Sequence, residues 1–473
     1  MKKLFFILPL LLISLSGYAQ EPYAIAPKHY GLVVTADYDE EKLKGLCGLT
    51  LSNESAQPVD SISLLLYRLM KVTEVTDDND QPLRYRQNVT EFDDFGQLQV
   101  NQIYVYKTLQ PGESTTIKLY YEGYLLGYAE TGMQYIKDRV SPAFTLIRFD
   151  TYAYPYPCLP SFDVLRQSVT RKFDYTLMVN VPDSLVAANG GKLVAKLDEN
   201  GISTFEYESK LPAWRIDIAI ASYKRLRAEG IDIFYFGSEE AAKRLSGYGE
   251  KCMQLYAQWW GKLKSELGMT IIETEEGSGG QTDETTILLP SESFNKEKGF
   301  EYLYHELSHL WNVSIQEQQG LSPRWEEGLA TFCQVLAAEK LGNEPKGYAK
   351  ERANRNIRWL NAQVARNEQL RGVPMVEYGN KDMTGYSYTH GAILFATLYY
   401  WLGDETFNKL VGGFYQQYYK NGASTKMFTD YCIKHSKNKQ LKALFDDWLY
   451  TTGYTKYLSN DTTVDDIIAV YKK

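Results

Sequence analysis

The segment YHELSHLWNV, residues 304–313, contains two of the five histidines in a chain of 473 residues. His305 and His309 are four residues apart, and Glu306 follows the first histidine. Side chains four positions apart lie on the same face of a helix, so the two imidazoles can bind one metal ion. Glu306 is rotated by about 100° from His305 and can reach a water on that ion. This arrangement is typical of zinc hydrolases, in which a carboxylate takes a proton from the water.

A catalytic zinc site needs a third protein ligand and one open position. The next predicted helix opens with WEEGLA, residues 325–330, so Glu326 and Glu327 are the candidates. Both could instead only complement the positive end of the helix dipole. We expect one of them to complete the site, because it begins the helix that follows the two histidines.

The first half of the chain has the pattern of β-strands. In residues 173–181 apolar side chains alternate with other types, which is the period of a half-buried strand. Similar short runs predict a sheet-rich domain. These runs are residues 31–36, 61–67, 97–106 and 117–121.

Beyond residue 228 the apolar residues recur at helical spacing. One strand is predicted at residues 231–236. Ser238 is then the expected N-cap of a long helix whose apolar face extends to Leu267. A further helix is expected over residues 296–313, around the two histidines.

The chain begins with the features of a secretory signal segment. Lys2 and Lys3 precede an apolar stretch at residues 4–15, and small residues at 17–19 provide a cleavage site before Gln20. The stretch is short for a membrane span, although an uncleaved anchor is the alternative. No later segment approaches about 18 apolar residues. We therefore expect export to the periplasm or the medium, with no transmembrane segment after cleavage.

Composition excludes some kinds of partner and site. The formal charge is −8 and no basic stripe is visible, which argues against nucleic acid as a partner. The five cysteines lie far apart without a CxxC pair, so they form neither a zinc ribbon nor a disulfide framework. Some could pair after export, but buried thiols are the simpler interpretation. These cysteines are Cys47, Cys158, Cys252, Cys333 and Cys432.

HELSH at residues 305–309, followed by WEEGLA, resembles the gluzincin zinc peptidases, and specifically the membrane alanyl aminopeptidase family. In that family the ligand glutamate directly precedes a glycine, which selects Glu327, before Gly328, as the third ligand. The 17 residues between His309 and Glu327 are one fewer than is usual in the family, which implies a small loop adjustment. The tail LWNV, residues 310–313, also resembles the related glycyl aminopeptidases.

The resemblance extends to YTHGA, residues 388–392, which is similar to the family's Tyr-x-Lys-Gly-Ala. It implies that the Tyr388 hydroxyl stabilises the tetrahedral intermediate. This chain has His390 where the family has lysine. Without the resemblance, Tyr388 would be one of 38 tyrosines.

The resemblance covers nearly the whole mature chain and implies its fold class. We expect a multidomain α and β protein, with a saddle-like N-terminal β-sandwich domain followed by a thermolysin-like α+β catalytic domain. We expect the family's large C-terminal helical domain to be missing and the active site to be more open than in larger members. The predicted divisions are a signal peptide at 1–19, the β domain at 20–228, the zinc peptidase domain at 229–458 and a C-terminal tail at 459–473.

An aminopeptidase must bind the free amine of its substrate, and the family uses a glutamate of a Gly-x-Met-Glu-Asn strand for this purpose. The corresponding region here is GSGGQTDE, residues 277–284, where the motif is not intact. A second amine-binding position of the family falls near Arg148 and Asp150. The substrate-binding candidates are Gly279, Gly280, Gln281 and Asp283.

These candidates differ in what they offer a peptide. The two glycines would let the backbone lie close to a bound substrate. Gln281 could accept a hydrogen bond from an amine, but it lacks the charge that makes such bonds strong. Asp283 or Glu284 could supply that charge, although strand neighbours point to opposite faces. The alternative is a polar loop with no part in binding.

Together these features predict an exported zinc metallopeptidase, favoured to be an aminopeptidase, with one Zn²⁺ per chain held by His305, His309 and Glu327. Peptides or proteins are the expected substrates, hydrolysed by zinc-activated water from which Glu306 takes the proton. The alternatives are an endopeptidase or an epoxide hydrolase at the same zinc site, or a catalytically silent peptide-binding scaffold. Glu306 argues against the scaffold, because a binding protein needs no general base.

Overall fold

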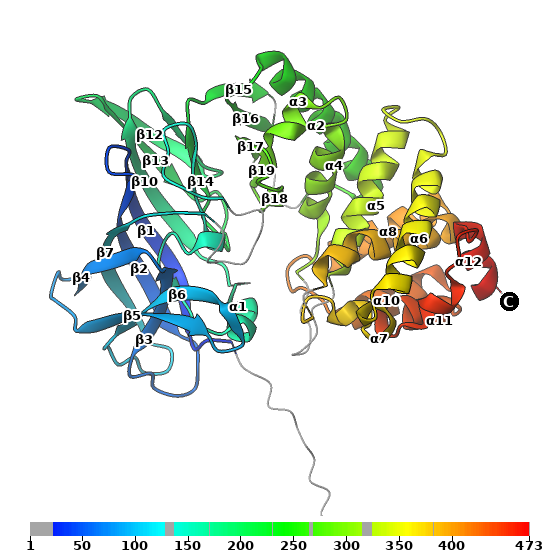
Figure 1. Cartoon of the computed structure of the whole chain (residues 1–473), viewed down its shortest axis with the longest axis horizontal. Coiled ribbons are helices and arrows are strands. Elements are labelled where there is room, and N and C mark those ends of the chain that lie inside the picture. Colours follow the sequence, from blue (N-terminus) through cyan, green and yellow to red (C-terminus); the bar gives the residue numbers. More distant parts are fainter. Residues whose placement is uncertain are drawn as a thin grey trace, which may run out of the picture.

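The computed structural model describes residues 22–127, 137–169, 171–228, 230–263, 268–314, 324–381 and 383–472. The predicted signal peptide, residues 1–19, lies outside these described residues. Figure 1 shows an N-terminal half built of strands and a C-terminal half built of helices, with a smaller sheet between them. The predicted fold class, an N-terminal β domain followed by a mixed α and β domain, is confirmed by this arrangement.

Three sheets make up the N-terminal half. Their strands are β1 (Ile25–Asp37), β2 (Lys42–Asn53), β3 (Ile62–Tyr67), β4 (Met70–Asp77), β5 (Tyr85–Phe92), β6 (Phe95–Val105), β7 (Ser114–Gly123), β8 (Thr145–Ile147), β9 (Tyr156–Pro157), β10 (Asp174–Pro182), β11 (Val186–Ala188), β12 (Lys192–Glu199), β13 (Ile202–Glu208) and β14 (Ile218–Ala221). The largest sheet has the order β12-β13-β10-β1-β2-β7-β4, and the others have the orders β5-β6-β3-β9 and β11-β14-β8. At the centre of the large sheet, β1 runs parallel to β10 and antiparallel to β2.

Alternating side chains explain how these sheets pack. In β10, Leu177, Val179 and Val181 are at most 2% exposed, while the residues between them are partly or fully exposed. This is the alternation that the sequence predicted for residues 173–181. The buried faces form one continuous hydrophobic core in this half of the molecule. Each large apolar side chain buried there contributes about 1.5–3 kcal/mol to folding.

The second half begins with a five-stranded sheet in the order β15-β16-β17-β19-β18. Its strands are β15 (Lys224–Ala228), β16 (Ile231–Tyr235), β17 (Met269–Thr274), β18 (Gln281–Thr282) and β19 (Thr286–Pro290). The three inner strands are parallel, and the two edge strands pair antiparallel to them. The domain boundary that we predict near residue 228 falls in the turn between β15 and β16, so one strand of this sheet precedes it.

Helices form the remainder of the second half. They are α2 (Glu239–Trp260), α3 (Ser291–Asn295), α4 (Phe300–Ser308), α5 (Trp325–Lys340), α6 (Tyr348–Arg366), α7 (Gln369–Gly372), α8 (Thr384–Leu402), α9 (Asp404–Tyr418), α10 (Thr425–Ser436), α11 (Leu441–Phe445) and α12 (Val464–Tyr471), with α1 (Phe162–Ser168) in the first half. Short turns are η1 (Phe149–Thr151), η2 (His309–Trp311), η3 (Met375–Glu377), η4 (Asp446–Tyr450) and η5 (Gly453–Tyr457). Within the described part of the chain, no helix combines the length and apolarity needed to span a membrane.

Helix α2 begins at the cap that the sequence predicts. The Ser238 side chain accepts a hydrogen bond of 3.3 Å from the backbone N–H of Ala241. The helix ends at Trp260, because Gly261 adopts a φ of 88° that a regular helix does not allow. Leu267, to which we expected the helical face to extend, lies outside the described residues.

The segment predicted as a C-terminal tail contains helix α12. Thr463 and Asp466 form a capping box at its start. Val464 and Ile467 are fully buried in the core that α12 shares with α6 and α8. The residues after 458 therefore contribute to the packing of the helical half.

Candidate metal centre and active site

His305 and His309 lie where helix α4 ends. The helix passes directly into η2 and is shorter than the predicted segment 296–313. His309 nevertheless keeps helical backbone angles, with φ −63° and ψ −20°. The two imidazoles therefore project from the same face of one continuous helical turn.

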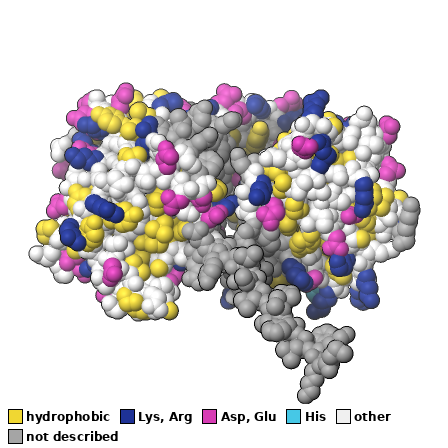
Figure 2. All heavy atoms as spheres, turned by 60° about the horizontal axis from the view of Figure 1, so that its bottom comes forward, with side chains coloured by type: hydrophobic (Ala, Val, Ile, Leu, Met, Phe, Trp, Pro, Cys, Tyr) yellow, Lys and Arg dark blue, Asp and Glu magenta, His cyan; other side chains and the backbone are white. Residues whose placement is uncertain are grey.

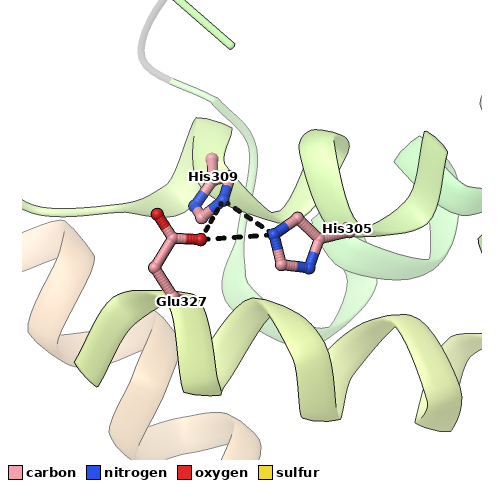
Figure 3. Close-up of side chains that lie close together, drawn as sticks. All are labelled: His305, His309 and Glu327. Atoms are coloured by element: carbon pink, nitrogen blue, oxygen red, sulfur yellow. Dashed lines mark hydrogen bonds and ion pairs between the residues drawn. The ribbon is translucent and has the colours of Figure 1, made fainter. Parts of the chain in front are cut away.

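Three ligand atoms converge at this point, as Figure 3 shows for the side chains of His305, His309 and Glu327. The two Nε2 atoms are 3.3 Å apart, and Glu327 Oε2 lies 3.4 Å from the first and 3.5 Å from the second. In a tetrahedral site with ligands about 2.1 Å from the ion, the ligand atoms are about 3.4 Å from one another. The donor set and its spacing therefore fit zinc.

Gln334, on the same helix as Glu327, orients the first imidazole. Its Oε1 lies 2.9 Å from His305 Nδ1. An amide oxygen only accepts, so Nδ1 carries the proton and Nε2 turns its lone pair to the metal position. Gln334 was not predicted from the sequence, although it follows Glu327 by seven residues, about two turns of helix α5.

Asn312 makes the corresponding contact with the second imidazole. Its side-chain amide lies 2.8 Å from His309 Nδ1. With Nε2 facing the metal position, Nδ1 carries the proton and must donate it, so the amide oxygen has to be the acceptor. Because amide ends are assigned from their hydrogen bonds, a half-turn of the Asn312 amide gives this arrangement.

Glu327 comes from the first turn of α5. Its other oxygen, Oε1, accepts a hydrogen bond of 3.1 Å from Arg324, a residue with left-handed backbone at φ 50°. Burial alone would raise the pKa of Glu327, but its interactions with His305 and His309, and the charge of Arg324, outweigh burial and lower that pKa well below its ordinary value. Glu327 is therefore ionised, which is the form of a carboxylate that binds a metal.

Helices α5 and α8 approach each other backbone to backbone beside this cluster. A Cβ built on Gly328 would lie 2.3 Å from the Cα of Gly391, and one built on Gly391 would lie 2.7 Å from the Cα of Gly328. Neither position has room for a side chain. Gly328 follows Glu327, and Gly391 lies about one helical turn after Tyr388. The contact therefore sets the separation between a ligand and the tyrosine.

Tyr388 lines the same cavity as the three ligands and is 37% exposed. Its ring faces the His305 ring at a centroid distance of 5.9 Å and an angle of 18°. Burial, and then the charge of Glu327, raise the pKa of Tyr388. The hydroxyl therefore keeps its proton and can donate a hydrogen bond into the cavity.

His390, the departure from the family motif, is fully buried away from solvent. Its Nδ1 lies 2.9 Å from the hydroxyl of Tyr378, and its ring is 4.2 Å from that of Tyr454. Burial lowers the pKa of His390 to about 3, so the imidazole is neutral. An uncharged group among aromatic rings thus stands where the family has a lysine.

Glu306 is held by the edge strand β18. The Thr282 hydroxyl donates to Glu306 Oε2 at 2.5 Å. A Cβ at Gly280 would lie only 2.2 Å from Glu306 Oε1. Gly280 thus makes room for the carboxylate of Glu306, and it also lines the cavity, where we expect it to let a bound peptide lie close. Gly279 beside it has a φ of 72° and also lines the cavity.

Gln281 is already engaged by groups from the N-terminal half. Its Oε1 accepts hydrogen bonds from Arg148 at 3.2 Å and from Arg215 at 2.8 Å. Its Nε2 donates to Asp150 at 3.0 Å. An amide oxygen has two lone pairs, and both lone pairs of the Gln281 oxygen are used by the two arginines. The oxygen therefore cannot accept the hydrogen bond from a substrate amine that the sequence suggested.

Asp283 and Glu284 also line the cavity. Glu284 is paired with Lys172. Burial, and then the charge of Asp217, raise the pKa of Asp283 to about 7. Asp283 is therefore a carboxyl group that gains a full charge near neutral pH, or when a cation binds beside it.

The three ligands, Glu306, Tyr388 and residues 279–284 line one cavity to which both halves contribute. Figure 2 shows the two halves side by side on the surface, with a notch between them. The volume of the cavity is about 1440 Å³, compared with about 300–1,000 Å³ for a typical small-molecule site. Asp150 and Arg215 line it from the N-terminal half, and the metal cluster and Tyr388 line it from the helical half. The cavity therefore has room for several residues of a peptide.

The ligand geometry predicts which carboxylate matters for metal binding. We expect about one zinc ion per chain, lost or strongly weakened in His305→Ala, His309→Ala and Glu327→Ala. Glu326→Ala is the matched control, because its carboxylate is not among the three converging groups. Elemental analysis of the purified variants measures the effect. Zinc lost from Glu326→Ala and kept by Glu327→Ala would reverse the choice between the two neighbours.

Comparison with solved structures places the whole arrangement in a known fold. The M1 zinc metallopeptidase of Deinococcus radiodurans superposes with a TM-score of 0.64 at 20% identity, over 91% of this chain and 95% of that one. A mutant of an M1 zinc metallopeptidase from the same organism, bound to a Tyr-Ser-Ala substrate, gives 0.63 at 18% identity, over 90% and 94%. These likenesses establish the fold.

Sequence comparison covers a smaller part of the chain. The alanine/arginine aminopeptidase of Saccharomyces cerevisiae is 25% identical over 157 residues, 33% of this chain. The chain spans only 18% of that enzyme's length. Residues 279–448 match the Peptidase family M1 domain. This range contains the three converging ligands His305, His309 and Glu327, together with Glu306 and Tyr388. The metal cluster thus lies within the segment that matches the Peptidase family M1 domain, in agreement with the resemblance read from HELSH and WEEGLA.

Proposed function

We propose that this protein is a zinc-dependent metallopeptidase that hydrolyses peptide bonds beside His305, His309 and Glu327. The observation that carries the proposal is the meeting of three ligand atoms within 4.8 Å of one another, in a cavity that Glu306 and Tyr388 also line. A site that only stored metal would need neither a carboxylate outside the ligand set nor a hydroxyl donor. Cleavage of a peptide bond requires both.

The chemistry can be assigned to particular side chains. When bound, zinc supplies Lewis-acid polarisation of the carbonyl group and activation of water. Glu306 takes the proton of the attacking water and then delivers it to the leaving amine. Tyr388 donates its hydroxyl hydrogen to the oxygen that becomes negatively charged.

Two substitutions distinguish the role of Glu306 as the base from that of Tyr388 as the hydroxyl donor. Glu306→Gln should keep zinc and lose about 10²- to 10⁴-fold in turnover, the usual contribution of acid–base catalysis. Tyr388→Phe should keep zinc and lose about 10²- to 10³-fold in kcat with little change in KM. Steady-state kinetics with a peptide amide measure both effects. Near wild-type kcat in Tyr388→Phe would show that another group stabilises the oxyanion.

We further propose aminopeptidase action, with the substrate amine bound beside Asp150 and Asp283. Both carboxyl groups line the cavity on the side of β18. Burial would raise the pKa of Asp150, but the charges of Arg215 and Arg148 outweigh burial and lower it. Asp150 is therefore ionised and can attract an ammonium group.

The charge balance of this wall supports the same proposal. Two guanidinium groups, of Arg148 and Arg215, meet three carboxylates in a network of hydrogen bonds of 2.6–2.9 Å. These carboxylates are Asp138, Asp150 and Asp217. One negative charge is thus left without a cation of its own. An ammonium group is the natural partner for that charge.

Peptides with free and acetylated N-termini test this preference. The free series should be cleaved with a higher kcat/KM, and the first residue should be released, because acetylation removes the ammonium charge. Chromatography of the products identifies the bond that is cut. Equal kcat/KM for both series, with cuts at internal bonds, would establish an endopeptidase. Cleavage of neither series, with turnover of an epoxide or with binding alone, would favour the other two alternatives.

We also propose that the chain is exported through its first 19 residues. The support is the sequence of this segment, in which two lysines, an apolar stretch and small residues precede Gln20. Expression of the full chain in a bacterial host should yield a processed protein that begins at Gln20. Mass spectrometry of the periplasmic fraction measures this, and an intact N-terminus in a cytoplasmic product would contradict it.

A further inference from the structure

Besides the Gln281 network, the side chain of Arg166 connects the two halves of the molecule at the cavity wall. Arg166, on α1 of the N-terminal half, donates through Nη1 to the carbonyl oxygen of Gly379 at 3.1 Å and to Asn380 Oδ1 at 3.0 Å. Gly379 and Asn380 belong to the turn between η3 and α8 in the helical half. We call this connection the Arg166 bridge.

Both ends of the bridge rest on fixed structure. Helix α1 is capped by Ser161 and by Asp94, whose carboxylate accepts from the backbone N–H groups of Phe162 and Asp163. Its inner face is buried through Val164 and Leu165. The base of the bridge is therefore part of the N-terminal core and does not move independently.

The turn at the other end is equally constrained. The Asn380 backbone N–H and side-chain Nδ2 both bond to Glu377, at 3.0 Å and 2.9 Å, so its Oδ1 is left to face Arg166. Tyr378, next to the turn, is fully buried and contacts His390 of α8. Because α8 also carries Tyr388, the bridge ends at a turn whose neighbour, Tyr378, contacts the helix of the hydroxyl donor.

The bridge forms part of the cavity wall, since Arg166, Gly379 and Asn380 all line it. Figure 1 shows α1 and α7, the helix before the turn, at the end of the molecule opposite β15, β16 and β17. The small sheet joins the two halves on one side of the cavity, and the bridge joins them on the other. The two halves are thus held together at the cavity wall by the small sheet and by the two hydrogen bonds of Arg166.

We propose that the Arg166 bridge sets the substrate class by chain length: it admits short peptides into the cavity and excludes long or folded chains. This inference rests on the proposed peptidase function of the same site. A short peptide fits within the cavity beside the bridge. A long chain must lie across the opening between the halves, where Arg166 holds α1 to the 379–380 turn, and it enters only after both hydrogen bonds break.

The test compares one tetrapeptide with a long unstructured peptide that begins with the same residues. Arg166→Ala should raise the ratio of kcat/KM for the long peptide to that for the tetrapeptide by about tenfold, as expected for two partly exposed bonds from a charged donor. Asn380→Ala should raise it less, because the Gly379 carbonyl still accepts. The double variant should equal Arg166→Ala, because both substitutions break one connection.

Arg352→Ala is the matched control, since Arg352 lines the same cavity and its removal changes the charge by the same amount. It should leave the ratio unchanged. An equal rise in Arg352→Ala, or an equal change for both substrates in Arg166→Ala, would overturn the proposal. Melting temperature and zinc content identify any variant that is only destabilised.

Binding measurements separate this inference from the proposed function. In a Glu306→Gln background, Arg166→Ala should tighten binding of the long peptide and leave the tetrapeptide Kd unchanged, which fluorescence anisotropy measures without turnover. If the wild-type protein cleaves neither peptide, the proposed peptidase function fails, while the binding ratio still decides the role of the bridge. Unchanged affinity for the long peptide would overturn that role.

Discussion

The site depends on the point where α5 and α8 touch through Gly328 and Gly391. A side chain on either glycine would collide with backbone at less than 3 Å, and backbone cannot rotate aside as a flexible side chain can. The backbone contact at the two glycines therefore fixes the distance between α5 and α8. Glu327 on one helix and Tyr388 on the other are placed by it. Catalytic groups displaced by about 1 Å lose about 10²-fold in rate, so two residues without side chains have as much influence on the geometry as the ligands.

A second constraint acts on the opposite wall, where charged groups are buried. Arg148 and Arg215 are only 1% and 2% exposed, and an unpaired charge there would cost several kcal/mol. The carboxylates around them remove most of that cost. Because Gln281 of the edge strand β18 joins the same network, the network attaches the N-terminal half to the strand that holds Glu306. The position of Glu306, the proposed general base, thus depends on ion pairs of the other half.

These two constraints explain which features the sequence could predict. His305, His309 and Glu306 follow from spacing within one helical turn, whereas the choice of Glu327 over Glu326 came from the family resemblance, in which the ligand precedes a glycine. The partners of Gln281 were not predictable, because Arg148 and Arg215 are separated from it by 133 and 66 residues. The role of Gly280 depends in the same way on a tertiary contact. Local periodicity indicates where strands and helices form, but not which distant side chains meet.

The division between the halves also explains why a large β domain accompanies so compact a metal site. All three ligands, the general base and the hydroxyl donor come from residues after 300, within the helical half. Asp150, the proposed partner of the substrate amine, and Arg166, whose side chain reaches the 379–380 turn, come from the N-terminal half. In the proposed function, the second domain supplies the zinc ligands, the general base and the hydroxyl donor, whereas the first contributes Asp150 to amine binding and Arg166 to the selection of chain length. Since the two sets are on different sheets and helices, a change in substrate selection need not disturb the ligand distances of 3.3–3.5 Å on which hydrolysis depends.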